Sequence, residues 1–407
     1  MSFCSSCKKN REQRLKQQII DSLQFTRSDS TLLETSLFLA NACQYRQELN
    51  SANYNKLIRI SDSLYVLNIS SDSISYILNI FLNQDYNRII KEQEDLKGIS
   101  YKEIIRHAHE SLLFYGKEWN KHLSTKQYLE WVCPYRVDNE QLENWRSYII
   151  QNLRQTMKIS LDSGYSATEL CTILNDHLKK NRGIEIKEII PQNIGLPPHT
   201  LLKMTSGSCK NYCNLGCFVM RSFGLPVCID GMPNGHTWNV LLTPEGIIDF
   251  STCEYSPNEN HLKRWLEYME YKRLPRSYRQ MFIPDSNSLA LQNVHEAIPL
   301  FFQSPFYKDV TNEYYIGETH SIEIKNQIQK KEFVYLSIFN KGFIYLTWAR
   351  KNKNLATFTH LTDSILYFPC YYSTSNTFEA FNYPFFINKD KAIHYFKPDT
   401  LHKQTMV

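Results

Sequence analysis

Three cysteines at four-residue spacing are the side chains of this sequence whose arrangement most suggests chemistry. Cys209, Cys213 and Cys217 lie in the stretch SGSCKNYCNLGCFVMRSFGLP. A spacing of four places all three on one face of a helix, one turn apart. Such a row is too extended to hold one ion, and no second close pair of cysteines follows to complete a zinc site. We therefore expect no metal, and either a row of small buried side chains or one reactive thiol.

Cys209 differs from the other two because it falls in the first turn of the predicted helix. It directly follows Gly207-Ser208, and the helix is expected to run to Phe223. At a helix N-terminus, unpaired backbone N–H groups and the helix dipole favour a thiolate and can stabilise an oxyanion. Cys213 and Cys217 lie deeper, where cysteine behaves as a small hydrophobic residue. We therefore predict a nucleophile at Cys209 and a buried helix face at the other two.

A cysteine nucleophile needs a base and a group that orients the base. The stretch NGHTWNVLLTPEGIIDFSTCE supplies His236, at the start of a predicted strand, and Asp249, on the next strand. The turn between the strands is expected at Pro244-Glu245, because proline and glycine interrupt the apolar run there. His236 and Asp249 are therefore the candidates for the base and the orienting acid.

The register of this hairpin leaves the third site residue open. If Pro244-Glu245 form a two-residue loop, Cys253 is the residue opposite His236. Asp249 then lies four residues along the strands, roughly 13 Å away at ~3.3 Å per residue. Two nearby residues are alternatives for the orienting role: Ser251 and Glu254.

Together these residues resemble the active-site motif of the transglutaminase-like superfamily. The motif runs from 207 to 252 as G-x-C, Arg221, Gly-Leu-Pro, G-H-x-W and an acidic residue. The resemblance implies a papain-like Cys-His-Asp site in which Cys209 is the nucleophile, His236 the base and Asp249 the orienting acid. The sequence departs from the pattern at Lys203, where papain-like enzymes carry a glutamine that contributes to the oxyanion hole.

Other stretches are similar to bacterial transglutaminase-like lipoproteins, namely residues 122–146, 309–314 and 334–340. The N-terminal sequence MSFCSSCKKN also resembles the end of a lipoprotein signal, with Cys7 as the lipid acceptor. The resemblance implies an extracytoplasmic protein attached to a membrane through a lipidated Cys7, provided that translation starts upstream of Met1. The alternative is a solvated tail with two incidental cysteines.

The chemistry implied by the resemblance is cysteine-dependent reaction at an amide bond of a peptide or protein substrate, without a cofactor. Hydrolysis through a thioester intermediate is the leading expectation, and transglutaminase-type acyl transfer to an amine is the first alternative. A second alternative is a relict site in a protein that binds peptide or sugar on the aromatic residues of its C-terminal region. A third is an extracellular scaffold with no catalytic role.

The distribution of patterns along the chain predicts an α+β protein. Helical periodicity dominates from about residue 11 to 185, and short β-branched and apolar runs dominate after 226. We expect four parts: a tail at 1–15, a helical domain at 16–190, a transglutaminase-like (papain-like) α+β core at 191–285, and a β-sandwich at 286–407.

Composition limits the partners of the protein. The net charge is only +5, from 46 basic and 41 acidic residues spread along 407 residues. No basic block predicts binding to nucleic acid, and no run of 18 apolar residues predicts a membrane span. Hydrophobic residues make up 42% of the sequence, which is ample for globular cores.

Overall fold

The computed structural model contains both helices and sheets, which confirms the mixed α and β class. It describes residues 5–25, 30–67, 69–157, 164–180, 185–187, 189–233, 235–270, 273–292, 295–374 and 378–398. The chain forms two compact units. The first unit comprises 1–229 and 237–262, and the second comprises 230–236 and 263–407.

The helices, in chain order, are α1 (Ser5–Phe25), α2 (Ser30–Ala42), α3 (Ala52–Val66), α4 (Ser71–Ile89), α5 (Asp95–Gly98), α6 (Tyr101–Ser111), α7 (Thr125–Trp131), α8 (Trp145–Met157), α9 (Ala167–Lys180), α10 (Pro198–Lys203), α11 (Cys209–Ser222), α12 (His261–Tyr268), α13 (Leu289–Gln292), the 3-10 helix η1 (Leu300–Gln303) and α14 (Thr311–Tyr314).

The strands are β1 (Gln47–Leu49), β2 (Glu92–Glu94), β3 (Glu185–Ile186), β4 (Ser206–Gly207), β5 (Val227–Gly231), β6 (Thr237–Thr243), β7 (Gly246–Phe250), β8 (Tyr278–Gln280), β9 (Tyr307–Asp309), β10 (Glu318–Glu323), β11 (Phe333–Phe339), β12 (Phe343–Asn352), β13 (Leu355–Leu361), β14 (Phe368–Tyr371), β15 (Glu379–Ala380), β16 (Phe385–Ile387) and β17 (Ile393–Tyr395).

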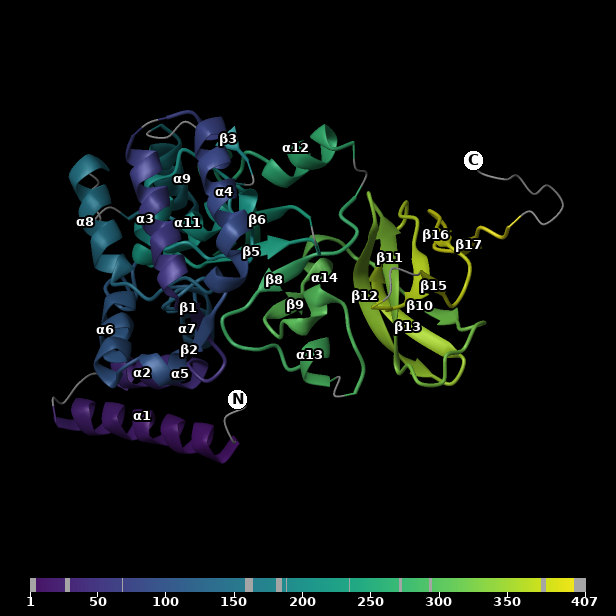
Figure 1. The fold of residues 1–407 in the computed structure, drawn as a ribbon, viewed down its shortest axis with the longest axis horizontal. Helices are drawn as coiled ribbons and strands as arrows, with labels where there is room; N and C mark the ends of the chain where they lie inside the picture. Colours follow the sequence, from purple (N-terminus) through teal and green to yellow (C-terminus); the bar gives the residue numbers. More distant parts are fainter. Residues whose placement is uncertain are drawn as a thin grey trace. The chain divides into compact units, whose positions relative to one another are not determined.

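The first unit carries a largely helical N-terminal part, in which α3 and α4 pack side by side (Figure 1). The stretch SATELCTILNDHLKKNRG predicts a helix that opens with a capping box at Ser166 and ends at Gly183. The capping box is present in α9, because the Ser166 N–H donates to the Glu169 carboxylate and the Glu169 N–H donates back to the Ser166 hydroxyl. Gly183 lies outside the described residues. The apolar spacing of residues 31–49 predicts a helix over this whole stretch, which is wrong beyond Ala42 because residues 47–49 pair with β2 as strand β1.

The N-terminus differs from the tail expected at residues 1–15, because helix α1 begins at Ser5. Leu15, Ile19 and Leu23 are buried, and their four-residue spacing gives the helix one apolar face. The helix packs on α2 and α6, and the Arg11 guanidinium donates to the Lys97 carbonyl. The charged residues that suggested a tail lie on the rest of this helix.

Strands β6 and β7 form an antiparallel hairpin in the first unit, and α11 packs on β6. Gly216 allows this packing. A Cβ atom at that position would lie 2.0 Å from the Thr252 hydroxyl and 2.7 Å from the Asn239 amide oxygen. The helix and the strand therefore approach more closely than any larger residue would permit.

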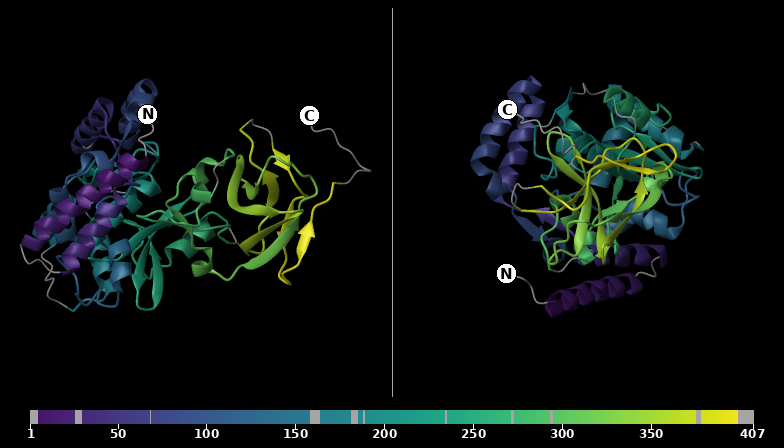
Figure 2. Two further views of the ribbon diagram at one scale, coloured as in Figure 1. Left: turned by 90° about the horizontal axis from the view of Figure 1, so that it is seen from below. Right: turned by 90° about the vertical axis from the view of Figure 1, so that its right-hand side faces the viewer.

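The second unit is built mainly of strands. Its largest sheet has the order β10-β13-β12-β11-β14-β15 with antiparallel neighbours, and it is strongly curved (Figure 2). The sequence Asn340-Lys341-Gly342 predicts a turn, and this turn joins β11 to β12, with Lys341 in the left-handed region at φ 55°. A smaller pair, β8 and β9, precedes this sheet in the chain.

Candidate functional site

Cys209 is the first residue of α11 and is half-buried, whereas every later residue of this helix from Asn211 on is buried. Ser208 caps the helix, because its hydroxyl accepts the Asn211 N–H while its own N–H donates to the Asn211 side chain at 3.0 Å. The cap satisfies the N–H of Asn211, the third residue of the helix. The positive end of the helix dipole therefore lies beside the Cys209 thiol. The predicted place of Cys209 in the first helical turn is confirmed.

The other two cysteines of the row form part of the buried helix face, as expected. Cys213 and Cys217 are almost fully buried, and the Asn239 amide donates to the Cys213 carbonyl at 2.9 Å. Burial raises the pKa of the Cys213 thiol well above its ordinary value, which suits a packing role. Thr237, the first residue of β6, lies beside this thiol.

The C-terminal end of α11 is held by donors that sequence reasoning missed. Gly224 adopts φ 75° just after the helix, which matches the predicted stop. Three carbonyl groups at this end then accept side-chain N–H groups from outside the helix. The pairs are Arg146 Nη1 to Arg221 O at 2.6 Å, Trp119 Nε1 to Phe223 O at 2.9 Å, and Asn120 Nδ2 to Gly224 O at 3.0 Å.

The segment 132–146 connects both ends of α11. At the start of the helix, Lys210 forms an ion pair with Asp138 at 2.9 Å. At the end, Arg146 is fully buried and donates to three carbonyl groups, those of Arg221, Val132 and Pro134. Burial lowers the pKa of the Arg146 guanidinium to about 10, so it remains charged at neutral pH. This segment fixes the helix that carries Cys209.

A second charged cluster holds α10, which precedes the Cys209 turn. His199 lies between Asp62 of α3 and Glu143, with Nε2 3.1 Å from the Asp62 carboxylate and Nδ1 2.5 Å from that of Glu143. Lys203, which departs from the glutamine of papain-like enzymes, pairs with the same Asp62 at 2.9 Å. Hydrogen bonds to the two carboxylates raise the pKa of His199 to about 9.

The hairpin register agrees with the two-residue loop expected at Pro244-Glu245. Thr243 pairs with Gly246, and Val240 pairs with Asp249. Val240 is four residues after His236 in the chain. Asp249 therefore pairs with the residue four positions after His236, as the predicted two-residue loop requires.

The Asp249 carboxylate accepts the backbone N–H of Leu262 at 2.8 Å, at the start of α12. His261 lies nearby, with Nδ1 3.8 Å from the same carboxylate. Burial lowers the pKa of His261 to about 4, so this imidazole is neutral at pH 7 and the contact is not an ion pair. The two alternatives for the orienting role bond to each other, since the Ser251 hydroxyl donates to the Glu254 carboxylate at 2.9 Å.

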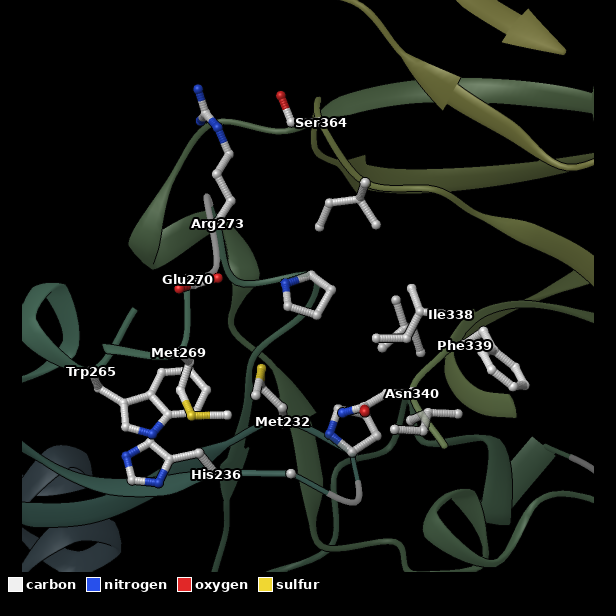
Figure 3. A pocket seen from close by; sticks show the side chains of 16 residues that line it. Met232, His236, Trp265, Met269, Glu270, Arg273, Ile338, Phe339, Asn340 and Ser364 are labelled. Atoms are coloured by element: carbon white, nitrogen blue, oxygen red, sulfur yellow. The ribbon is translucent and has the colours of Figure 1, made fainter. Parts of the chain in front are cut away.

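His236 belongs to the second unit and is half-buried. Its ring lies flat against the indole of Trp265 on α12, with centroids 4.4 Å apart and an interplanar angle of 9°. Both rings line a cavity of about 560 Å³ (Figure 3). Trp265 was missed by sequence reasoning, although the pattern HLKRWLEY is itself typical of the helix that carries it.

The described residues include no group of three His, Cys, Asp or Glu side chains placed to hold a metal ion. Among the described helices, none has the length and hydrophobicity needed to cross a bilayer. Comparisons with protein-family models, with curated proteins and with solved structures returned no match.

Proposed function

We propose that this protein is a cysteine-dependent enzyme acting on an amide bond of a peptide or protein, with a site of the transglutaminase-like kind. Cys209 is the nucleophile and His236 the base. The observation that carries this proposal is the packing of α11 on β6, the strand that begins directly after His236. Thr237 of that strand lies beside Cys213, which is one helical turn from Cys209.

In the proposed reaction the Cys209 thiolate attacks the amide carbonyl carbon, and the Cys209 backbone N–H stabilises the tetrahedral oxyanion. His236 holds the thiol proton and delivers it to the leaving amine as the C–N bond breaks, which leaves a thioester. Water then attacks the thioester and transfers one proton to His236, and the C–S bond breaks to release the carboxylic acid and restore the Cys209 thiolate beside the protonated His236. Stacking on Trp265 holds the imidazole ring of His236 in a fixed plane, with the two ring centroids 4.4 Å apart.

Asp249 completes the proposed site as the residue that positions His236 through α12. Its carboxylate holds the first turn of the helix at Leu262, and Trp265 of the same helix stacks on His236. A carboxylate near a helix N-terminus also interacts favourably with the helix dipole. In this proposal the acid orients the imidazole through the helix.

The proposal extends to the fold and to the setting of the protein. We assign α11 and the β6–β7 hairpin to a papain-like core, and the strand-rich C-terminal region to a β-sandwich. An extracytoplasmic location, with a lipid on Cys7, would follow from an upstream start of translation. Cys7 is exposed on α1. The DNA sequence before Met1 tests this part, since an in-frame stop close upstream, with no apolar codons between, contradicts it.

The pH dependence of Cys209 alkylation tests the enzyme proposal. A Cys4→Ser, Cys7→Ser background removes the N-terminal thiols, and the other thiols on described residues are buried. With iodoacetamide, followed by peptide mass spectrometry, Cys209 is expected to react readily below pH 8. His236→Ala should slow the reaction at pH 6.5 by about tenfold or more, because the imidazolium partner is lost. An ordinary thiol profile in both proteins contradicts the proposal and favours a relict binding site.

Hydrolysis and acyl transfer differ only in what attacks the thioester. Incubation of a glutamine-containing protein with a labelled primary amine distinguishes them, because only acyl transfer incorporates the label. We expect release of ammonia or of a peptide amine without incorporation. Incorporation that requires Cys209 would assign transglutaminase-type chemistry instead.

A further inference from the structure

The cavity beside His236 has walls of two kinds. On one side lie the His236 and Trp265 rings with Met232 and Met269, and on the other lie aliphatic side chains of β11, of β12 and of the segment between β13 and β14 (Figure 3). The aliphatic residues of that wall are Ile338, Ile344, Leu346 and Ile365. A ligand that fills the cavity must therefore be mainly apolar where it touches these walls.

The main charged groups at the rim, Arg273 and Glu270, leave the cavity walls mainly apolar. Arg273 forms an ion pair with Asp363, with Nε 2.8 Å from the carboxylate, so its charge is already compensated. Glu270 is exposed at the edge. A cavity of about 560 Å³ exceeds the volume of one side chain and lies in the usual range for ligand sites.

We infer that this cavity receives a bulky apolar side chain, aromatic or branched aliphatic, of the substrate residue that supplies the leaving amine. The inference rests on the proposed function. A base that protonates the leaving nitrogen must come within about 3 Å of it, and His236 is itself part of the cavity wall. The Cα and side chain of the leaving residue begin one bond from that nitrogen, so they lie at the mouth of the cavity.

The test compares probes that differ only in this side chain. Cys209 in the Cys4→Ser, Cys7→Ser background is alkylated with N-chloroacetyl-L-phenylalaninamide, its leucinamide analogue and its glycinamide analogue. We expect the apolar probes to react about 10- to 100-fold faster than the glycine probe, which corresponds to burial of one large side chain. Iodoacetamide, which lacks a side chain, reports the reactivity of the thiol alone.

Two cavity variants and one control make the test specific. Met269→Gln and Ile365→Asn should reduce the preference for apolar probes to less than about threefold, and each rate is divided by the iodoacetamide rate of the same variant to remove any change in the thiol itself. Met269 is partly exposed, so its variant is expected to fold. Leu291→Gln is the matched control, because Leu291 is exposed in the same unit and does not line the cavity; it should keep the full preference.

The outcomes separate the two proposals. Reactivity that depends on His236 but shows no preference between glycine and phenylalanine probes overturns the cavity inference and leaves the enzyme proposal standing.

As a second measurement, Cys209→Ser protein labelled with ¹³C at its methionine methyl groups is titrated with N-acetyl-L-phenylalaninamide. Shifts of the Met232 and Met269 signals are expected. Their absence overturns the inference, and shifts without any activation of Cys209 make the cavity a binding site unconnected with catalysis, which also overturns it.

Discussion

Asp249 accepts a hydrogen bond from the backbone N–H of Leu262, and this bond fixes the first turn of α12. Trp265 lies one turn further along the same helix and stacks on His236. A carboxylate on β7 is thus connected to the proposed base by one short helix. In the proposed site, Asp249 positions His236 through this helix, a role that does not require contact between the two side chains.

Asp249→Ala should therefore weaken both stability and chemistry. Loss of the carboxylate leaves the Leu262 N–H without its acceptor and should lower the free energy of unfolding by about 0.5–2 kcal/mol. The Cys209 alkylation rate at pH 6.5 should fall together with that of Trp265→Ala, because both changes release His236. Chemical denaturation and alkylation kinetics measure the two effects. Loss of reactivity in Asp249→Ala with normal reactivity in Trp265→Ala would instead indicate direct contact with the base.

Serine substitution of the cysteines of α11 should affect activity at one position and stability at the other two. Cys209→Ser should abolish amide-bond chemistry with little change in the melting temperature, because the side chain is half-buried at a helix start. Cys213→Ser and Cys217→Ser bury a hydroxyl in place of a thiol and should cost about 1–3 kcal/mol each while activity is retained. Loss of activity in all three variants, together with zinc found by elemental analysis, would point to a metal site.

Gly216→Ala should disturb the packing of α11 on the hairpin. Its Cβ would meet the Thr252 hydroxyl and the Asn239 amide, both of which are buried. Overpacking of this kind costs about 1–3 kcal/mol, more than the gain in helix propensity offsets. Gly342→Ala is the control, because nothing lies within 4 Å of its Cβ position. Equal unfolding midpoints for the two variants in urea would contradict the close approach described above.

Stability should depend on His199 in the alkaline range. Its pKa is raised to about 9 from an ordinary value of 6.5, so the stabilisation is fully present below pH 6.5 and is lost as the pH rises through 9. His199→Gln should lower the free energy of unfolding by about 1–2 kcal/mol at pH 6, allowing for partial solvent exposure. At pH 9.5 the variant and the parent should be nearly equal. Urea unfolding at both pH values provides the measurement, and a constant difference between the two proteins would exclude this titration.

Sequence patterns predicted the local features of the site well. The boundaries of α11, the stop at Gly224 and the two-residue loop at Pro244-Glu245 all follow from short-range rules on caps, turns and alternation. These rules depend on residues within about four positions of each other, which the sequence displays directly. The same rules missed residues 5–10, which precede the helical pattern expected from about residue 11, because this charged segment belongs to a helix whose apolar face packs on α6 far along the chain.

Long-range partners could not be predicted in the same way. Arg146 and Arg221 are 75 residues apart, and Trp119 and Phe223 are 104 residues apart. Buried arginine and tryptophan side chains need hydrogen-bond acceptors, but their sequence does not say which carbonyl groups supply them. The stacking of Trp265 on His236 is of the same kind, since it depends on where α12 returns after the hairpin.

The tight β6–β7 connection restricts how the length of the chain can vary at this point. Thr243 pairs with Gly246 across only two residues, and side chains alternate between the two faces of each strand. One residue inserted after Glu245 and absorbed as a shift in pairing would exchange the two faces of β7, turning Asp249 away from Leu262 and moving the buried Phe250 to the opposite face. Related sequences should therefore lengthen or shorten this connection by two residues at a time, or carry a bulge that absorbs the odd one.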